Sequence, residues 1–233
     1  MLDIRLQKVA ALVRPGSRLA DIGTDHAYLP TALVQRGVCP TAIASDVRPG
    51  PVQAARRTVE AAGLSDKIDV RLGDGLEPIR PDEAEDIVIA GMGGETIAAI
   101  LAAAPWVKDS RYRLILQPMT RGEELRRYLF GAGFAILEER AAADSRHVYA
   151  VLSAQYTGQA FQAEEALCFV GRMPPEEGEV YLRKAEERLF KQIEGLRQSD
   201  LGRGQPHGED IQTLLNLIKR IEQYIDGSWT PWM

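Results

Sequence analysis

The chain opens on an amphipathic pattern and continues as short apolar runs separated by mixed segments. Residues 2–13 repeat apolar side chains at helical spacing, at Leu2, Leu6, Val9, Ala10 and Val13. This period is typical of a helix with one buried face, and Pro15-Gly16 supplies its end. The pattern therefore predicts an N-terminal helix over residues 2–13.

Five short apolar runs follow, at residues 18–22, 42–46, 68–72, 86–90 and 113–117. Each precedes a helical pattern, and the clearest of these patterns cover residues 51–62, 95–104 and 121–132. Continuous apolar strands that alternate with helices indicate an α/β protein with a parallel sheet covered on both faces. We therefore expect five strand–helix units.

Two further runs, at residues 134–138 and 147–154, have only a polar link between them. A link without a helix suits neighbouring antiparallel strands. These runs predict an antiparallel hairpin at the edge of the sheet.

The pattern changes near Tyr156, after which no strand pattern recurs. Beyond a loop around Met173, two segments repeat apolar positions at Leu182, Ala185, Leu189, Ile193 and Leu196, then at Ile211, Leu214, Ile218, Ile221 and Ile225. Such narrow seams with a short link predict an antiparallel, coiled-coil-like helical hairpin that folds without help from the sheet. The expected division is a Rossmann-like domain over 1–155 and a helical hairpin domain over 156–233.

Composition narrows the class of protein. The 233 residues are 45% hydrophobic and 26% charged, and the formal net charge of −5 excludes a global basic field but not a local basic face. Cys39 and Cys168 lack metal-ligand spacing and are expected to be buried in a protein of a reducing compartment. The N-terminus does not resemble a signal peptide, and no apolar run reaches about 20 residues. We expect a cytoplasmic protein without a membrane segment or a metal.

Ligands collect at the carboxyl ends of strands in open α/β sheets, so the residues at those ends carry the candidate chemistry. Acids and glycines stand at nearly every predicted end: Asp21, Gly23, Thr24, Asp25 and His26; Ser45 and Asp46; Gly73, Asp74 and Gly75; Gly91, Met92, Gly93 and Gly94; and finally Gln117.

These residues predict a site for an adenosine without phosphates. Gly23 stands alone where a dinucleotide fold has G-x-G-x-x-G, so no pyrophosphate cradle is indicated. Asp46 follows Gly23 by 23 residues and can bind the two hydroxyls of a ribose. Asp74 can accept a hydrogen bond from an adenine amine. The cofactor that fits is S-adenosylmethionine, and the five units plus a terminal hairpin match the class I methyltransferase layout.

Each feature alone has a structural alternative. Asp46 equally fits an N-cap before the Pro49–Pro51 turn. Residues 73–75 also fit an ordinary turn, and Gly91–Gly94 can serve to pack a helix closely on the sheet. His26 is as well suited to a helix cap or a carbonyl contact as to chemistry. The occurrence of all these residues at successive strand ends favours the cofactor site.

Four motifs resemble those of the bacterial tRNA (adenine-N1)-methyltransferases that modify position 22, the TrmK family. They are D-I-G-T-D-H-A-Y-L-P, G-D-G-L, I-A-G-M-G-G and L-I-L-Q-P, and the resemblance covers roughly residues 1–155. It implies S-adenosylmethionine as the methyl donor, N1 of a tRNA adenine as the acceptor, and a hairpin that helps to hold tRNA.

The resemblance also implies site residues. Cofactor contacts fall on Asp21, Gly23, His26, Asp46, Asp74, Gly75, Gly91, Met92 and Gly93. The chain has Met119 where family members often have Asn after Q-P, which leaves Gln117 as a polar contact of that loop.

Methylation at N1 needs alignment more than a base, because this nitrogen has a free lone pair and no proton to lose. The product base is cationic, so a nearby acid can stabilise it, and Asp25 is the candidate. An N-cap role for Asp25 is equally compatible with the sequence. Tyr28 can stack on a base flipped out of the tRNA, although a core position is the stronger expectation for it.

Binding of tRNA requires local positive charge. The candidates are Arg121 beside the fifth strand end and Arg183, Lys184 and Arg188 in the hairpin, with further patches at Arg56, Arg57, Arg126, Arg127, Arg140, Arg146 and His147. Glu186, Glu187 and Glu194 are interleaved with the hairpin cations, so a solvated face with intrahelical ion pairs remains an alternative. Methylation of another substrate and a non-catalytic module with a dimerisation arm also remain alternatives.

Overall fold

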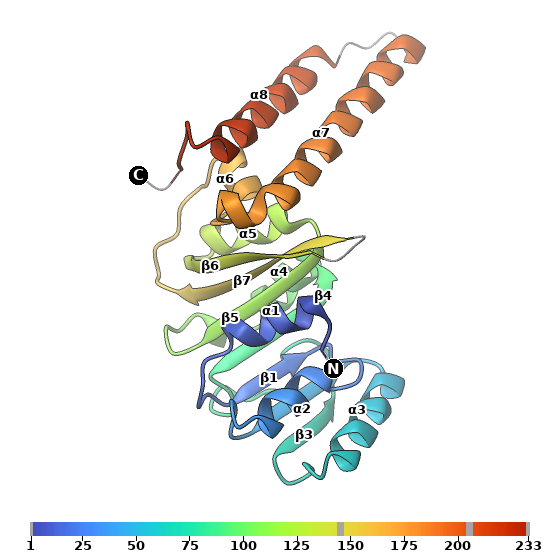
Figure 1. Cartoon of the computed structure of the whole chain (residues 1–233), viewed down its shortest axis with the longest axis vertical. Helices are drawn as coiled ribbons and strands as arrows, with labels where there is room; N and C mark the ends of the chain where they lie inside the picture. Colours follow the sequence, from blue (N-terminus) through green and yellow to red (C-terminus); the bar gives the residue numbers. More distant parts are fainter. Residues whose placement is uncertain (1, 144–146, 204–206, 232–233) are drawn as a thin grey trace.

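A computed structural model describes residues 2–143, 147–203 and 207–231 (Figure 1). The strands are β1 Leu19–Ile22, β2 Ala42–Asp46, β3 Ile68–Leu72, β4 Asp86–Gly93, β5 Arg113–Thr120, β6 Phe134–Ala143 and β7 Val148–Tyr156. They form one sheet in the order β3-β2-β1-β4-β5-β7-β6. The first five strands are parallel, and β7 pairs antiparallel with both β5 and β6. The predicted Rossmann-like sheet with its antiparallel edge is confirmed.

Helices cover both faces of the sheet. One face carries α1 Ile4–Leu12, α2 Tyr28–Gln35 and α3 Pro49–Ala61, and the other carries α4 Gly94–Ala103 and α5 Gly122–Gly131. Successive strand residues alternate between the two cores. Leu19 and Val88 pack on the α1 side, whereas Ala20 and Ile87 pack on the α4 side. β1, β2 and most of β4 and β5 are buried on both faces, which explains why these strands read as continuous apolar runs, whereas β3 at the sheet edge is partly exposed.

Two segments differ from the sequence prediction. Residues 73–85 between β3 and β4 form turns instead of the expected helix, so the sheet lacks one of its five strand–helix units. The loop expected around Met173 is present, and it is preceded by a short helix, α6 Glu165–Val170, that the sequence pattern did not predict. A run of six residues is too short to show a helical period.

The C-terminal helices α7 Pro175–Arg203 and α8 Gly208–Ile225 extend from one end of the sheet as a long arm (Figure 1). Their seam buries Leu182, Leu189 and Ile193 against Ile218 and Ile221, as the heptad-like spacing predicted. The ends of the predicted seam, Ile211 and Ile225, are only partly buried.

Contacts of the buried Arg126 join the arm to the sheet domain, and the expectation that the hairpin folds without the sheet stays a prediction. The Arg126 guanidinium on α5 donates to Glu139 on β6 at 2.9 Å, and both side chains are buried. Arg126 also donates to the carbonyl of Cys168 on α6 at 2.9 Å and contacts the Tyr181 hydroxyl on α7. Burial opposes the charge of Arg126, but the Glu139 carboxylate outweighs it and raises the arginine pKa.

Both cysteines are buried, as expected, and burial raises the pKa of each thiol to about 11. Within the described residues, no helix has both the length and the apolar character that a membrane crossing requires.

Candidate active site at the strand ends

The turn after β1 depends on glycine. Gly23 has a φ of +75°, a conformation that side chains disfavour, and a Cβ at this position would overlap the end of the Met92 side chain. The Thr24 hydroxyl then accepts a hydrogen bond from the amide of Ala27 at 3.1 Å, where α2 is about to begin. Gly23 is therefore favoured by its backbone conformation and lies against the end of the Met92 side chain from the β4 loop.

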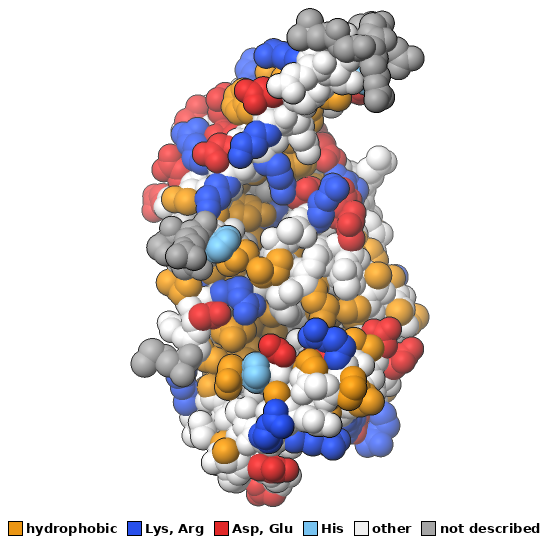
Figure 2. Space-filling model, turned by 90° about the vertical axis from the view of Figure 1, so that its right-hand side faces the viewer, with side chains coloured by type: hydrophobic (Ala, Val, Ile, Leu, Met, Phe, Trp, Pro, Cys, Tyr) orange, Lys and Arg blue, Asp and Glu red, His pale blue; other side chains and the backbone are white. Residues whose placement is uncertain are grey.

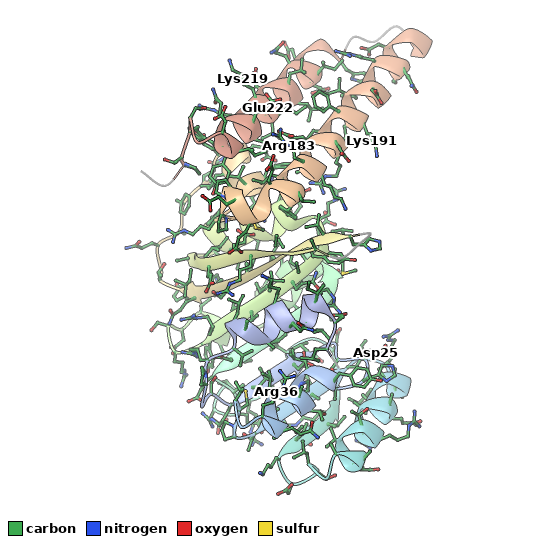
Figure 3. The ribbon with its side chains drawn as sticks, viewed as in Figure 1. Asp25, Arg36, Arg183, Lys191, Lys219 and Glu222 are labelled. Atoms are coloured by element: carbon green, nitrogen blue, oxygen red, sulfur yellow. The ribbon has the colours of Figure 1, made fainter. Side chains whose placement is uncertain are left out.

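Asp25, His26 and Tyr28 form a cluster at the rim of this edge. The Asp25 carboxylate lies 3.4 Å from His26 Nε2, and the His26 ring stacks on the Tyr28 ring with centroids 5.1 Å apart. Asp25 lies on the side of the molecule toward which the β4 end points (Figures 1 and 3). The N-cap of α2 is Ala27, so Asp25 is not the cap. The expectation that Tyr28 is a core residue is also wrong, because the side chain is exposed.

Asp21 lies beneath this turn, buried on the α1 face of β1. Burial raises the pKa of its carboxyl to about 6, against the lowering effects of the hydrogen bond from Thr24 and the charge of Arg5. The carboxyl therefore changes charge in a range close to neutral pH.

Gln117 is fully buried and joins the ends of three elements. Its Oε1 accepts hydrogen bonds from the Arg5 guanidinium of α1 at 2.8 Å and from the Gly91 amide of β4 at 3.0 Å. Its amide nitrogen donates to the carbonyl of Pro118 at 2.9 Å. These contacts fit a residue that fixes the β4 and β5 loops, rather than one whose amide faces a substrate.

Asp46 is buried at the end of β2, where its Oδ1 accepts a hydrogen bond from the Arg48 amide at 2.8 Å. The N-cap of α3 is Arg48, so the helix-cap alternative for Asp46 is wrong. The carboxylate is held in a tight turn immediately beside the β1 end.

The loops after β3 and β4 complete the edge. Asp74 is exposed and begins a turn in which its carbonyl accepts from Glu77, while Gly75 has a φ of +50°. Gly91 is exposed with a φ of +85°, and Met92 and Gly93 are half-buried. Gly94 has the packing role, because a Cβ there would overlap the carbonyl oxygen of Arg121.

The predicted tRNA-binding cations do not form one patch. Arg121, Lys184 and Arg188 line a shared cavity, whereas Arg183 pairs with Glu179 and Glu186 along its own helix. Figure 2 views the strand-end side of the molecule, where Lys and Arg alternate with Asp and Glu along the arm.

Other expected cations have internal partners. Arg126 is buried, so the prediction that it belongs to a surface patch is wrong. Arg127 pairs with Glu124 and Glu165, and Arg140 pairs with Glu138. Arg56 donates to the carbonyl of Val70. Arg146 lies outside the described residues.

Arg5 is the residue of this edge that the sequence pattern missed. It contacts Gln117, lies 3.6 Å from Asp3 and contributes to the charge environment of Asp21. Arg5 is on the first helix and not at the end of a strand, so the strand-end pattern could not identify it. The packing of α1 on the sheet brings it to the site.

A family model described as a methyltransferase domain matches residues 2–152. The tRNA (adenine(22)-N(1))-methyltransferase of Bacillus subtilis is 43% identical over 154 residues, which are 66% of this chain and 65% of that protein. The sequence match thus spans slightly less than two thirds of the length of that relative.

Solved structures match along almost the whole chain. The M1A22 tRNA methyltransferase TrmK of Bacillus subtilis superposes with a TM-score of 0.79 at 30% identity, over 97% of this chain and 99% of that one. A Streptococcus pneumoniae structure in complex with S-adenosyl-L-methionine gives 0.81 at 34% identity, over 97% and 100%. The chain therefore belongs to the bacterial tRNA (adenine(22)-N1)-methyltransferase family, TrmK.

Proposed function

We propose that this protein transfers the methyl group of S-adenosylmethionine to N1 of adenine 22 in tRNA. The observation that carries the proposal is the adjacency of Gly23, Asp46 and Gly91 at the ends of the neighbouring strands β1, β2 and β4. Gly23 lets the backbone approach a ligand closely, Asp46 can bind a ribose, and Gly91 gives a second open glycine loop. Together these features suit a nucleoside without phosphates. Family membership supplies the tRNA adenine as the acceptor.

The residues present fit the cofactor. Gly23 and Gly91 both have positive φ, a backbone conformation that favours glycine, and neither turn carries a side chain of its own at these points. Asp46 would bind the ribose, and Asp74 with Gly75 would flank the adenine. When bound, the cofactor supplies a methyl group activated by a sulfonium.

The protein's own contribution to the reaction is orientation and charge. Adenine N1 attacks through its lone pair, so no residue has to remove a proton from it. The stacked His26 and Tyr28 rings offer a surface for a flipped base, and the neighbouring Asp25 carboxylate offsets the positive charge that the base acquires. Arg5 and Gln117 act as positioning residues, because they hold the loops that carry the site.

The proposed partner is therefore tRNA, and the proposed location is the cytoplasm. The chemistry requires no metal. No cluster of three or more His, Cys, Asp or Glu suited to a metal occurs among the described residues.

The direct test incubates the protein with labelled S-adenosylmethionine and unmodified tRNA. We expect N1-methyladenosine at position 22, identified by mass spectrometry of nuclease fragments. The matched control is the same transcript with guanine at position 22, which should accept no label. Transfer to the control transcript, or to protein instead of tRNA, contradicts the proposal.

A second experiment tests the cofactor site. Asp46→Asn retains an acceptor for the Arg48 amide but removes the negative charge, so the turn is preserved while the ribose contacts weaken. We expect S-adenosylmethionine binding to lose roughly 1.5–3 kcal/mol, the range for hydrogen bonds to a charged group. Asp66→Asn, at an exposed position before β3, is the control. Equal calorimetric affinities of the two variants contradict the role of Asp46.

A further inference from the structure

A cavity of about 120 Å³ lies where the arm meets the sheet. Its walls come from the end of β5, the start of α5, the beginning of β7, and α7. The charged side chains that line it are Arg121, Lys184 and Arg188, and no Asp or Glu is among the described residues of the lining. Tyr149 and Tyr181 are also part of the wall. This lining favours an anion with an attached organic group.

The cations of this cavity are positioned by the fold. Arg188 is held by Glu123 at 3.1 Å and lies over the Phe169 ring. Arg121 has an exposed side chain and a left-handed backbone, with φ of +56°, at the start of α5. Lys184 and Arg188 are one helical turn apart on α7. Lys191 lies farther out on the same face of this helix, on the same side of the molecule as Asp25 (Figure 3).

The cavity lies along the same edge as the candidate active site. Thr120 at its wall pairs with Gly93 of the glycine loop, and β5 is two strands from β1 in the sheet. Neighbouring strands are about 4.8 Å apart, so the β1 and β5 ends are separated by roughly 10 Å. A nucleic acid whose base reaches the β1 turn thus brings its adjoining backbone to this cavity.

From these observations we propose that the cavity binds a backbone phosphodiester of tRNA next to the methylated adenine, with Arg121 and Lys184 as its main charged contacts. The inference rests on the proposed function. According to this inference, the junction between sheet and arm positions the target base. The rest of the arm would contribute any further affinity for tRNA.

The first experiment measures binding of unmodified tRNA to the S-adenosylhomocysteine complex over a series of salt concentrations. Arg121→Glu and Lys184→Glu should each weaken binding by about fivefold or more and lower the salt slope by about one. Lys219→Glu, on the opposite side of the arm in Figure 3, reverses a charge on α8 away from the cavity and should change neither quantity. Unchanged cofactor affinity verifies that each variant is folded.

The second experiment locates the phosphate. A ligated tRNA carries one neutral methylphosphonate at a linkage flanking adenine 22, and its affinity is compared between the wild type and Arg121→Glu. Loss of affinity in the wild type but not in the variant supports the direct contact. Equal losses in both proteins at every flanking linkage overturn it, as does an unchanged salt slope in the first experiment.

These binding measurements are independent of methyl transfer. Wild-type protein that binds tRNA through the cavity but methylates no adenine would contradict the proposed function and leave the phosphate site standing. Wild-type protein that methylates adenine 22, with variants that bind as it does, would contradict only the phosphate site.

Discussion

Asp21 is a carboxyl group buried beneath the turn after β1, and its protonation links stability to pH. Its pKa is raised by burial from 3.8 to about 6, so the folded protein retains this proton more tightly than the unfolded chain does. The resulting stabilisation is complete below about pH 4 and is lost as the pH rises through 6.

Asp21→Asn should remove this dependence, because the amide mimics the protonated acid. We expect the cofactor-free variant to match the wild type near pH 4 and to exceed its unfolding free energy by about 3 kcal/mol at pH 8. Urea unfolding of both proteins from pH 4 to 8 measures the difference. A difference that stays constant with pH would mean that Asp21 is charged throughout.

Asp25 is exposed at the surface of the same turn, and its proposed role is to offset the charge of the methylated base. Asp25→Asn preserves the shape next to His26 and should lower the single-turnover rate roughly tenfold, less than buried electrostatic groups do because the side chain is exposed. Cofactor affinity should remain unchanged. Rapid-quench measurements with Asp66→Asn as the control decide the point, and equal rates in all three proteins would exclude a role for the charge.

At the scale of elements, Arg126 and Glu139 fasten α5, β6, α6 and α7 together. Glu139→Gln would leave a buried guanidinium without its counter-charge, which costs about 3–5 kcal/mol in comparable sites. The nearby pair of Arg127 and Glu165 is partly exposed, so Glu165→Gln should cost less than about 1 kcal/mol. Denaturant unfolding of the two variants compares these values. Similar losses would show that the buried pair contributes no more than a surface pair.

Most elements were predictable from sequence because their burial is periodic. The central parallel strands β1, β2, β4 and β5 are mostly buried on both faces, and the arm repeats its seam over several turns, so both patterns are long enough to recognise. Helix α6 has six residues and no measurable period. The loop between β3 and β4 buries Leu76 and Ile79 without a helix, which imitates a helical pattern.

The candidate site was predictable to the extent that strand ends determine it. The positions of Asp46 and of the glycines at the sheet edge could be predicted directly from the order of the strands. The places of Arg5 and Arg126 depend on which helix packs on which face, and a sequence pattern does not contain that information. An arginine on a predicted helix is usually at the surface, so the burial of Arg126 was the least expected result.

At the scale of the whole molecule, α6 connects two separate cores, because its Phe169 and Val170 pack with α7 and α8 whereas two other residues pack on the sheet. Leu167 and Cys168 of α6 pack in the same cluster as Leu116 and Phe130, although they follow the last strand. A chain that ends at Tyr156 would therefore lose both core residues and the carbonyls that Arg126 contacts.

A chain that ends at Met173 keeps α6 and should unfold at a higher temperature than a chain that ends at Tyr156. We expect the longer fragment to retain S-adenosylhomocysteine binding and both fragments to bind tRNA more weakly than the full chain. Thermal unfolding and calorimetry on the two fragments test this. Equal melting temperatures would mean that α6 contributes nothing to the sheet domain.

The late contacts of Arg126 have a consequence for synthesis in the cell. Translation produces the sheet first, but Arg126 acquires its last partners only when residues 168, 169 and 181 have left the ribosome. A nascent chain interrupted before that point holds a charged group in an unfinished interior and is open to degradation by proteases. We therefore expect a chain that ends before residue 168 to be cleaved by proteases faster than a chain that contains all three of these contacts.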